Sequence, residues 1–214
     1  MKDKRTQLIT INSISQLYKM MGLGKPEHPS ISLINYNDRP AVHIDGPISF
    51  ITHFYVVMLK RNVTGKIKYG QRFYDFDEGI MAFIAPGQMI SIDETDHNDA
   101  TGWLLVFHPD FISQYHLAKT MKEYGFFSYA VNEALHLSEK EEKMLEAIMK
   151  NIQQEYHSSI DQFSQDVMIS HLDLLLNYSN RFYNRQFLTR KTASNDLLVK
   201  LDHLLTDYFN SDKV

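Results

Sequence analysis

The chain has 214 residues, of which 43% are hydrophobic and 22% are charged, and its formal net charge is −4. This length allows one large domain or two small ones with a proper hydrophobic core. The absence of cysteine excludes disulfides and thiolate metal sites. The negative net charge argues against the chain binding a nucleic-acid backbone by itself. The N-terminal "MKDKRTQLITINSIS" lacks an apolar signal core, and no run approaches membrane-spanning length. We therefore expect a cytoplasmic protein without a membrane partner.

The N-terminal segment, residues 1–30, is predicted to form a short helix followed by a loop. Ser13 is a suitable N-cap for "ISQLYKMM", and Gly22 is a suitable end to that helix. The following "GKPEHP" contains two prolines and breaks any regular element.

The sequence pattern of residues 31–108 is typical of β-structure throughout. Short runs rich in Ile, Val, Phe and Tyr, such as "ISLINY", "AVHI" and "TGWLLVF", alternate with breakers such as "NDRP", "DGP" and "APG". Seven or so short strands separated by turns favour a sandwich or barrel over alternating β and α units. The fold class predicted for the whole chain is therefore α+β, with a β-barrel followed by a helical layer.

Residues 109–190 are predicted to be helical. Ser138 opens the first helix, "SEKEEKMLEAIMKNIQQEYH", and forms a capping-box pattern with Glu141 three residues on; a second helix is expected from about residue 161 to 184. Residues 191–214 contain a further amphipathic segment, which would act as a linker helix. The apolar stripe of the second helix is wider than one barrel face needs, which indicates either packing within the chain or a homodimer interface. The dimerisation candidates are Phe163, Val167, Leu174, Tyr178 and Phe182.

The predicted barrel carries aromatic and imidazole side chains that are able to line a ligand pocket. The alternative is that they fill the barrel as ordinary core. The pocket candidates are His43, His53, Tyr55, Tyr69, Phe83 and Trp103.

The sequence contains no motif for catalysis. A barrel metal site typically uses two or three histidines and a carboxylate, and no His-x-His pair occurs here. A rival hypothesis, a metal-dependent barrel enzyme such as an isomerase or dioxygenase, would use His43, His53 and Glu78. Gln88 stands directly after Pro86-Gly87, where a ligand-bearing barrel often has a histidine. Nucleophile elbows and phosphate-binding glycine loops are absent from the sequence, so no catalytic residue, metal or cofactor is predicted.

One basic cluster lies near the end of the second predicted helix and consists of Arg181, Arg185, Arg190 and Lys191. Basic residues between aromatic ones are able to contact phosphates. At a helix C-terminus they also interact favourably with the helix dipole, and this second interpretation needs no ligand.

Five phrases that span nearly the whole chain resemble the regulatory half of AraC-type transcriptional regulators, a cupin-like jelly-roll barrel followed by dimerisation helices. They are "HPSISLI" (28–34), "GQRFYDFDEGIMAFIAPGQ" (70–88), "GWLLVFHPDFI" (102–112), "FFSYAVNEALHLSEKE" (126–141) and "LLLNYSNRFYNRQFLTRK" (174–191).

The resemblance implies an effector-sensing and dimerisation domain that is not an enzyme. In that family, DNA is read by a following domain with two helix-turn-helix units. The sequence after residue 190 shows no such pair, so any DNA contact is expected through a C-terminal domain beyond these residues. A stand-alone sensor or small-molecule carrier is the remaining alternative.

Overall fold

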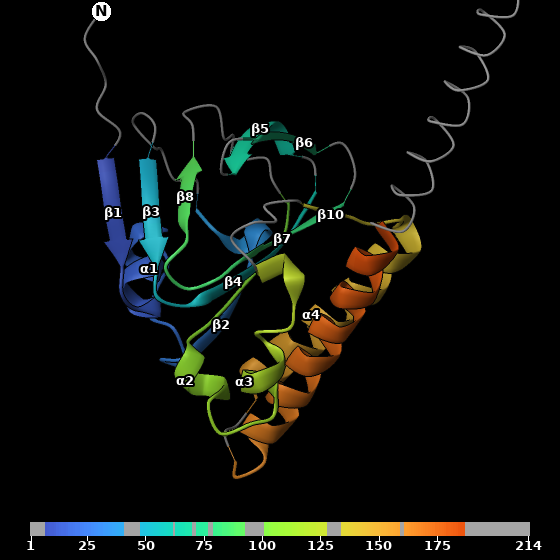
Figure 1. Ribbon diagram of the computed structural model, residues 1–214. Helices are drawn as coiled ribbons and strands as arrows, with labels where there is room; N and C mark the ends of the chain where they lie inside the picture. The colour runs from blue at the N-terminus through green and yellow to red at the C-terminus, as the bar shows by residue number, and fades with distance from the viewer. Residues whose placement is uncertain are drawn as a thin grey trace, which may run out of the picture.

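The computed structural model describes residues 7–40, 48–61, 63–69, 72–76, 79–92, 101–127, 134–158 and 161–186. Over these residues the chain folds as an α+β protein, as the sequence predicts. A three-stranded sheet and a five-stranded sheet face each other, and long helices cover the outer side of the larger sheet (Figure 1). The described strands do not close into a barrel.

The five-stranded sheet is antiparallel and forms the centre of the molecule. Its strands, in spatial order, are β10 (Leu135–His136), β7 (Ile80–Ile84), β4 (Tyr55–Arg61), β9 (Thr101–Phe107) and β2 (Ile31–Asn35). Strand β9 lies between β4 and β2 and is buried on both faces from Gly102 onward. Gly102 has φ +120°, and a Cβ there would collide with the Leu59 carbonyl on β4. Only glycine therefore fits at this position of β9.

The three-stranded sheet consists of β1 (Gln7–Ile11), β3 (Ile48–Thr52) and β8 (Met89–Ile92), and β1 runs parallel to β3. Strand β1 corrects the prediction of only a helix and a loop in residues 1–30. The alternation in "QLITI" spans five residues, which is too short to stand out beside a charged N-terminal run. A separate hairpin, β5 (Val63–Tyr69) and β6 (Arg72–Phe76), completes the described strands.

The helix boundaries follow the predicted caps. Helix α1 (Ile14–Met20) begins after Ser13, whose Oγ accepts a hydrogen bond from the Gln16 N–H at 3.2 Å. Helix α4 (Glu139–Tyr156) begins with the predicted capping box, in which the Ser138 N–H donates to the Glu141 carboxylate at 2.9 Å. Both predictions are confirmed.

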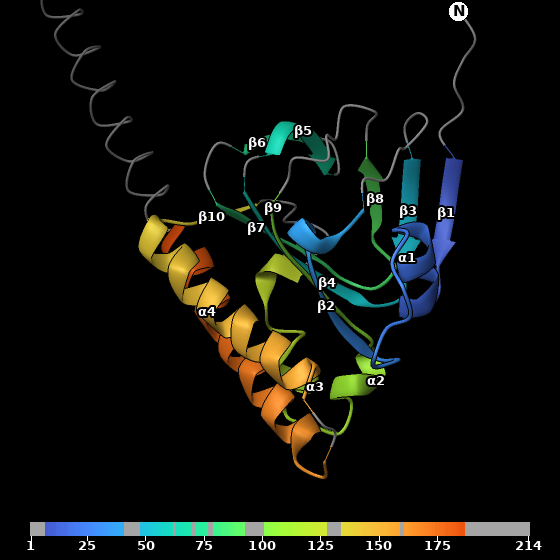
Figure 2. The same ribbon diagram turned by 180° about the vertical axis from the view of Figure 1, so that it is seen from behind.

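The segment after the sheets contains shorter helices than its spacing predicts. It forms α2 (Pro109–Ile112), α3 (Leu117–Thr120) and the 3₁₀ turn η2 (Gly125–Phe127), while a similar turn, η1 (Tyr36–Asp38), follows β2. A long helix then covers residues 164–186, here called the 164–186 helix. It lies beside α4 in both views of the molecule (Figure 2).

Two hydrophobic cores lie on opposite faces of the five-stranded sheet. The first joins that sheet to α2, α3, α4 and the 164–186 helix and includes Leu105, Leu145 and Leu172. The second joins it to α1 and the three-stranded sheet and includes Ile11, Ile84 and Val106. Neighbouring residues of one strand thus serve different cores, as the two-residue period of a strand requires.

The predicted linker helix of residues 191–214 lies outside the described residues, as do Arg190 and Lys191. Within the residues that the structure describes, no helix is long and apolar enough to cross a membrane.

Candidate functional site

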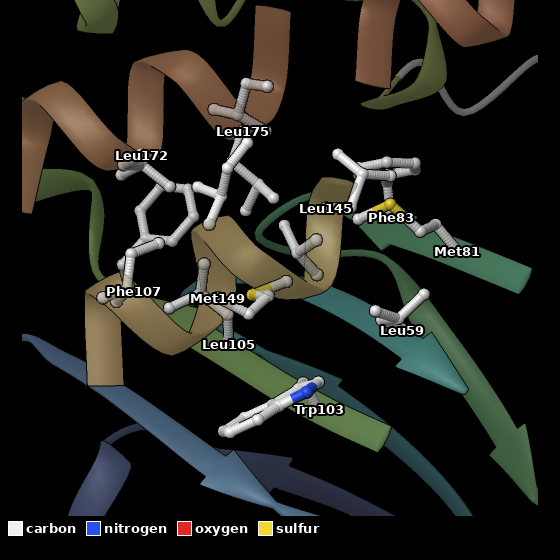
Figure 3. Close-up of a cluster of buried hydrophobic side chains, with 14 of the residues drawn as sticks. Leu59, Met81, Phe83, Trp103, Leu105, Phe107, Leu145, Met149, Leu172 and Leu175 are labelled. Atoms are coloured by element: carbon white, nitrogen blue, oxygen red, sulfur yellow. The ribbon is translucent and has the colours of Figure 1, made fainter. Parts of the chain in front are cut away.

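Three of the predicted pocket residues point toward the helices. In the register of the sheet, Phe83 pairs with Val57, Trp103 pairs with Leu59, and Tyr55 lies two residues from Val57 on the same strand face. Phe83 and Trp103 belong to the core against α4 and the 164–186 helix (Figure 3), and the partly buried Tyr55 packs against the same core. The structure therefore brings these aromatic residues together as packed core and places them away from the space between the two sheets.

Aromatic contacts hold the Phe83 and Tyr55 side chains in place. The Phe83 ring lies 4.1 Å from the Phe126 ring between centroids, and Tyr55 stacks on Phe107 at 5.1 Å and meets Phe127 edge to face at 5.0 Å. Phe83 and Trp103 are buried. Such contacts attach the helical segment after β9 to the sheet.

The remaining pocket candidates do not join this cluster. His53 is exposed, and its backbone N–H donates to the Ile11 carbonyl at 3.3 Å. His43 lies outside the described residues, and so does the side chain of Tyr69. Glu78, the carboxylate of the rival enzyme hypothesis, is also outside them. No group of three metal-ligating side chains occurs within the described ranges.

Gln88 has a structural role in the turn before β8. Its side-chain oxygen accepts a hydrogen bond from the Ala85 N–H at 2.8 Å, and its amide donates to the Phe127 carbonyl at 3.2 Å. The residue is buried. Gln88 is thus a hydrogen-bonded link between the turn and η2.

An exposed apolar stripe runs along the outer side of the 164–186 helix and the turn before it, and we define it as Phe163, Val167, Leu174 and Tyr178. The first three have exposed fractions of 59%, 38% and 44%, and Tyr178 is half-buried. They recur at steps of about one or two helical turns, so they share one side of the helix. Phe182, the fifth dimerisation candidate, is buried in the core against the sheet.

Charges of opposite sign flank the apolar stripe. Asp166 lies in the first turn of the helix and accepts a hydrogen bond from the Tyr115 hydroxyl at 2.6 Å, which raises the pKa of Tyr115. Arg181 is exposed near the other end. The stripe is therefore acidic at one end and basic at the other.

Ion pairs hold the helix pair in a fixed orientation on the sheet. Arg61 at the end of β4 pairs with Glu142 and, at 2.7 Å, with Glu146, both on α4. Arg185 pairs with Glu141 at 2.9 Å and donates to the His136 carbonyl at 3.2 Å. Arg185 is one of the candidate phosphate contacts in the sequence. In the structure it instead links the 164–186 helix to α4 and β10. The sequence gives no signal for Arg61, because its partners lie some eighty positions away.

A second set of polar contacts joins the N-terminal region to the end of α4. The Tyr18 hydroxyl lies 2.5 Å from the Ser32 hydroxyl, and burial raises the pKa of Tyr18 to about 12. The Glu27 N–H donates to the Tyr156 hydroxyl at 2.8 Å, and the Glu27 carboxylate lies 2.8 Å from His157 Nδ1. We call the contacts of Glu27 with Tyr156 and His157 the α4 junction.

No known protein-family model matches this chain, and a search of curated proteins finds no matching relative. The geometry therefore defines the class only as an α+β domain whose helical layer exposes an apolar stripe.

Proposed function

We propose that this chain is the effector-sensing and dimerisation domain of a transcriptional regulator that resembles the AraC type. In this proposal the two facing sheets represent a cupin-like jelly roll, and the helical layer pairs two copies of the chain. DNA is contacted by a helix-turn-helix domain outside residues 1–214, in keeping with the net charge of −4.

The observation that carries the proposal is the exposed apolar stripe. Phe163 in the turn before the 164–186 helix, and Val167 and Leu174 within it, place three large apolar side chains on the side away from the buried inner face. Exposed apolar residues that gather on one face typically mark a protein interface. A second copy of the same stripe is its natural partner, because most soluble oligomers are symmetric homo-oligomers.

The flanking charges favour an antiparallel pairing. Asp166 lies about two turns before Leu174 and Arg181 about two turns after it. A twofold axis near Leu174 would bring Asp166 of one copy close to Arg181 of the other. A parallel arrangement would instead bring like charges together, which is unfavourable.

The test is the oligomeric state of residues 1–214 measured by sedimentation velocity over a range of protein concentrations. The wild-type chain is expected to form a dimer. Leu174→Lys is expected to raise the dimer dissociation constant by about a hundredfold or more, because it places two charges at the centre of an apolar contact. Leu174 is 44% exposed, so the folded monomer accommodates the lysine.

The matched control is Leu8→Lys, the same substitution at a leucine on β1 that is 57% exposed. It is expected to leave the dimer unchanged. A wild-type chain that stays monomeric at high concentration would overturn the dimerisation proposal. Equal weakening by Leu8→Lys and Leu174→Lys would place the interface elsewhere and would also overturn it.

A further inference from the structure

An open depression of about 640 Å³ lies beside α1, on the outside of the two sheets. One wall is the side of α1 that carries Lys19, and the other is the loop that follows, with Leu23, Lys25, Pro26 and Pro29 among its lining residues. This volume falls in the range typical of small-molecule pockets. No residue of the apolar stripe forms its walls, and Leu23 also packs against the second core.

The chemistry of the walls selects for one kind of ligand. Lys19 and Lys25 bring two positive charges to the depression, and its lining residues include no carboxylate. This is a local reversal of sign in a chain with a net charge of −4. Leu23, Pro26 and Pro29 supply apolar surface beside the two ammonium groups.

We propose that this depression binds a small amphipathic anion and is the effector site. The anionic group, a carboxylate or a phosphate, pairs with Lys19 and Lys25, and the apolar body of the ligand covers Leu23 and the prolines. Charge-assisted hydrogen bonds to lysine provide orientation, and burial of apolar surface provides affinity.

The loop wall of the depression contacts α4, and the α1 wall contacts β2. Tyr18, next to Lys19 in α1, bonds Ser32 on β2, and Glu27 in the loop makes the α4 junction with Tyr156 and His157. A ligand that draws α1 and the loop together therefore acts on the end of α4. Transmission to the dimer rests on the proposed function, whereas binding at the depression does not.

The experiment is a titration followed by NMR on protein labelled with ¹⁵N-glycine. Gly22 and Gly24 line the depression, whereas Gly87 and Gly125 lie elsewhere and act as internal references. The probes are phenyl phosphate, 4-phenylbutyrate and the neutral 4-phenylbutanol. We expect both anions to shift the Gly22 and Gly24 signals with dissociation constants of about 1 mM or lower. The alcohol is expected to bind at least about tenfold more weakly, since it makes no charge-assisted contact.

The variant Lys19→Gln/Lys25→Gln removes both charges at exposed positions and is expected to weaken anion binding about tenfold or more. Lys140→Gln is the matched control, because Lys140 is an exposed lysine at the opposite end of α4 from the junction. Equal binding of alcohol and acids, unshifted Gly22 and Gly24 signals, or equal weakening by the control would each overturn the proposal.

Sedimentation of the same samples separates this proposal from the dimerisation proposal. Shifted glycine signals in a chain that stays monomeric would support the anion site and overturn dimerisation. A dimer in which neither anion shifts the Gly22 and Gly24 signals would support dimerisation and overturn the proposed anion site. Binding is also measured on Leu174→Lys, where we expect an unchanged dissociation constant because the stripe is no part of the depression.

Discussion

The face of the five-stranded sheet that meets the helices carries large aromatic side chains, whereas the opposite face carries mainly aliphatic ones. Phe83, Trp103 and Phe107 lie on the helix side, and Val56, Ile84 and Val106 lie on the side of the smaller sheet. Rings fill the uneven space between a sheet and crossing helices, while branched aliphatics fit the layer between two facing sheets. Aromatic residues on a strand therefore identify the helix-covered face here and give no evidence of a ligand pocket.

The largest predicted effect uses two neighbouring leucines of β9, one in each core. Leu105 is fully buried on the helix side, and Leu104 is 7% exposed on the other side. Each change to alanine is expected to lower the free energy of unfolding by about 2–5 kcal/mol. Leu105→Ala should lie in the upper half of that range, because the helices packed over this face of the sheet leave little freedom to fill the cavity.

Urea denaturation of the two variants checks this difference. If Leu104→Ala lowers the free energy of unfolding by as much as Leu105→Ala, the two cores are equally adaptable. The distinction between the two faces would then be one of composition alone.

The class of fold was predictable because it depends on local patterns. Caps at Ser13 and Ser138 and the run of short strands between Ile31 and Phe107 are visible without any long-range information. The direction in which each strand faces was not predictable. In β9 every residue from Gly102 to Phe107 is buried, so no alternating polar residue indicates which face meets the helices.

The candidate site was predictable only where one element carries it. The apolar stripe appears in the sequence as excess width of one helix, and four of its five predicted residues lie on the outer side or are half-buried. Phe182 belongs to the core because it lies on the side of the helix that meets the sheet. The depression beside α1 was missed, since its walls come together only through the fold of a loop with no recognised motif.

A smaller effect is predicted for a polar contact on the side of the smaller sheet. Tyr18→Phe removes the hydroxyl that bonds Ser32, a residue with no exposed surface. Leaving the serine hydroxyl without this partner is expected to cost about 1–3 kcal/mol of unfolding free energy. Thermal and urea unfolding measure the change, and Tyr178→Phe, a half-buried tyrosine of the outer stripe, is the matched control. A loss of similar size in the control would show that hydroxyl removal has no special cost at Tyr18.

The ion pairs on the helix side predict a pH dependence with a defined sign. The hydrogen bond from Arg61 holds the pKa of Glu146 below its ordinary value of 4.5. A depressed carboxyl pKa contributes stability that is present above the unfolded pKa and is lost as pH falls through the folded pKa. Wild-type stability should therefore decline below about pH 4.5 as this carboxylate takes up a proton.

Glu146→Gln tests the origin of that decline. It is expected to lower the free energy of unfolding at pH 7 by about 1 kcal/mol or less, because the pair is partly exposed, and to make the acid decline shallower. Denaturant unfolding between neutral pH and about pH 3 provides the measurement. An unchanged acid slope in the variant would assign the decline to other carboxylates and leave the Arg61–Glu146 pair without a share in it.

The smallest predicted effect concerns the charges beside the apolar stripe and distinguishes the two ways of pairing helices. In the antiparallel arrangement, Arg181→Glu places two acidic residues together and is expected to weaken the dimer about three- to fivefold. Asp166→Arg is expected to have a similar effect. The double variant should recover most of the wild-type affinity, and recovery should be smaller at high salt because exposed pairs are screened. In a parallel dimer, Asp166 and Arg181 would each face the same residue of the other copy. Exchanging the two charges would then not restore the affinity of the dimer. Failure of the double variant to recover would therefore favour parallel helices, even with the contact at Leu174 intact.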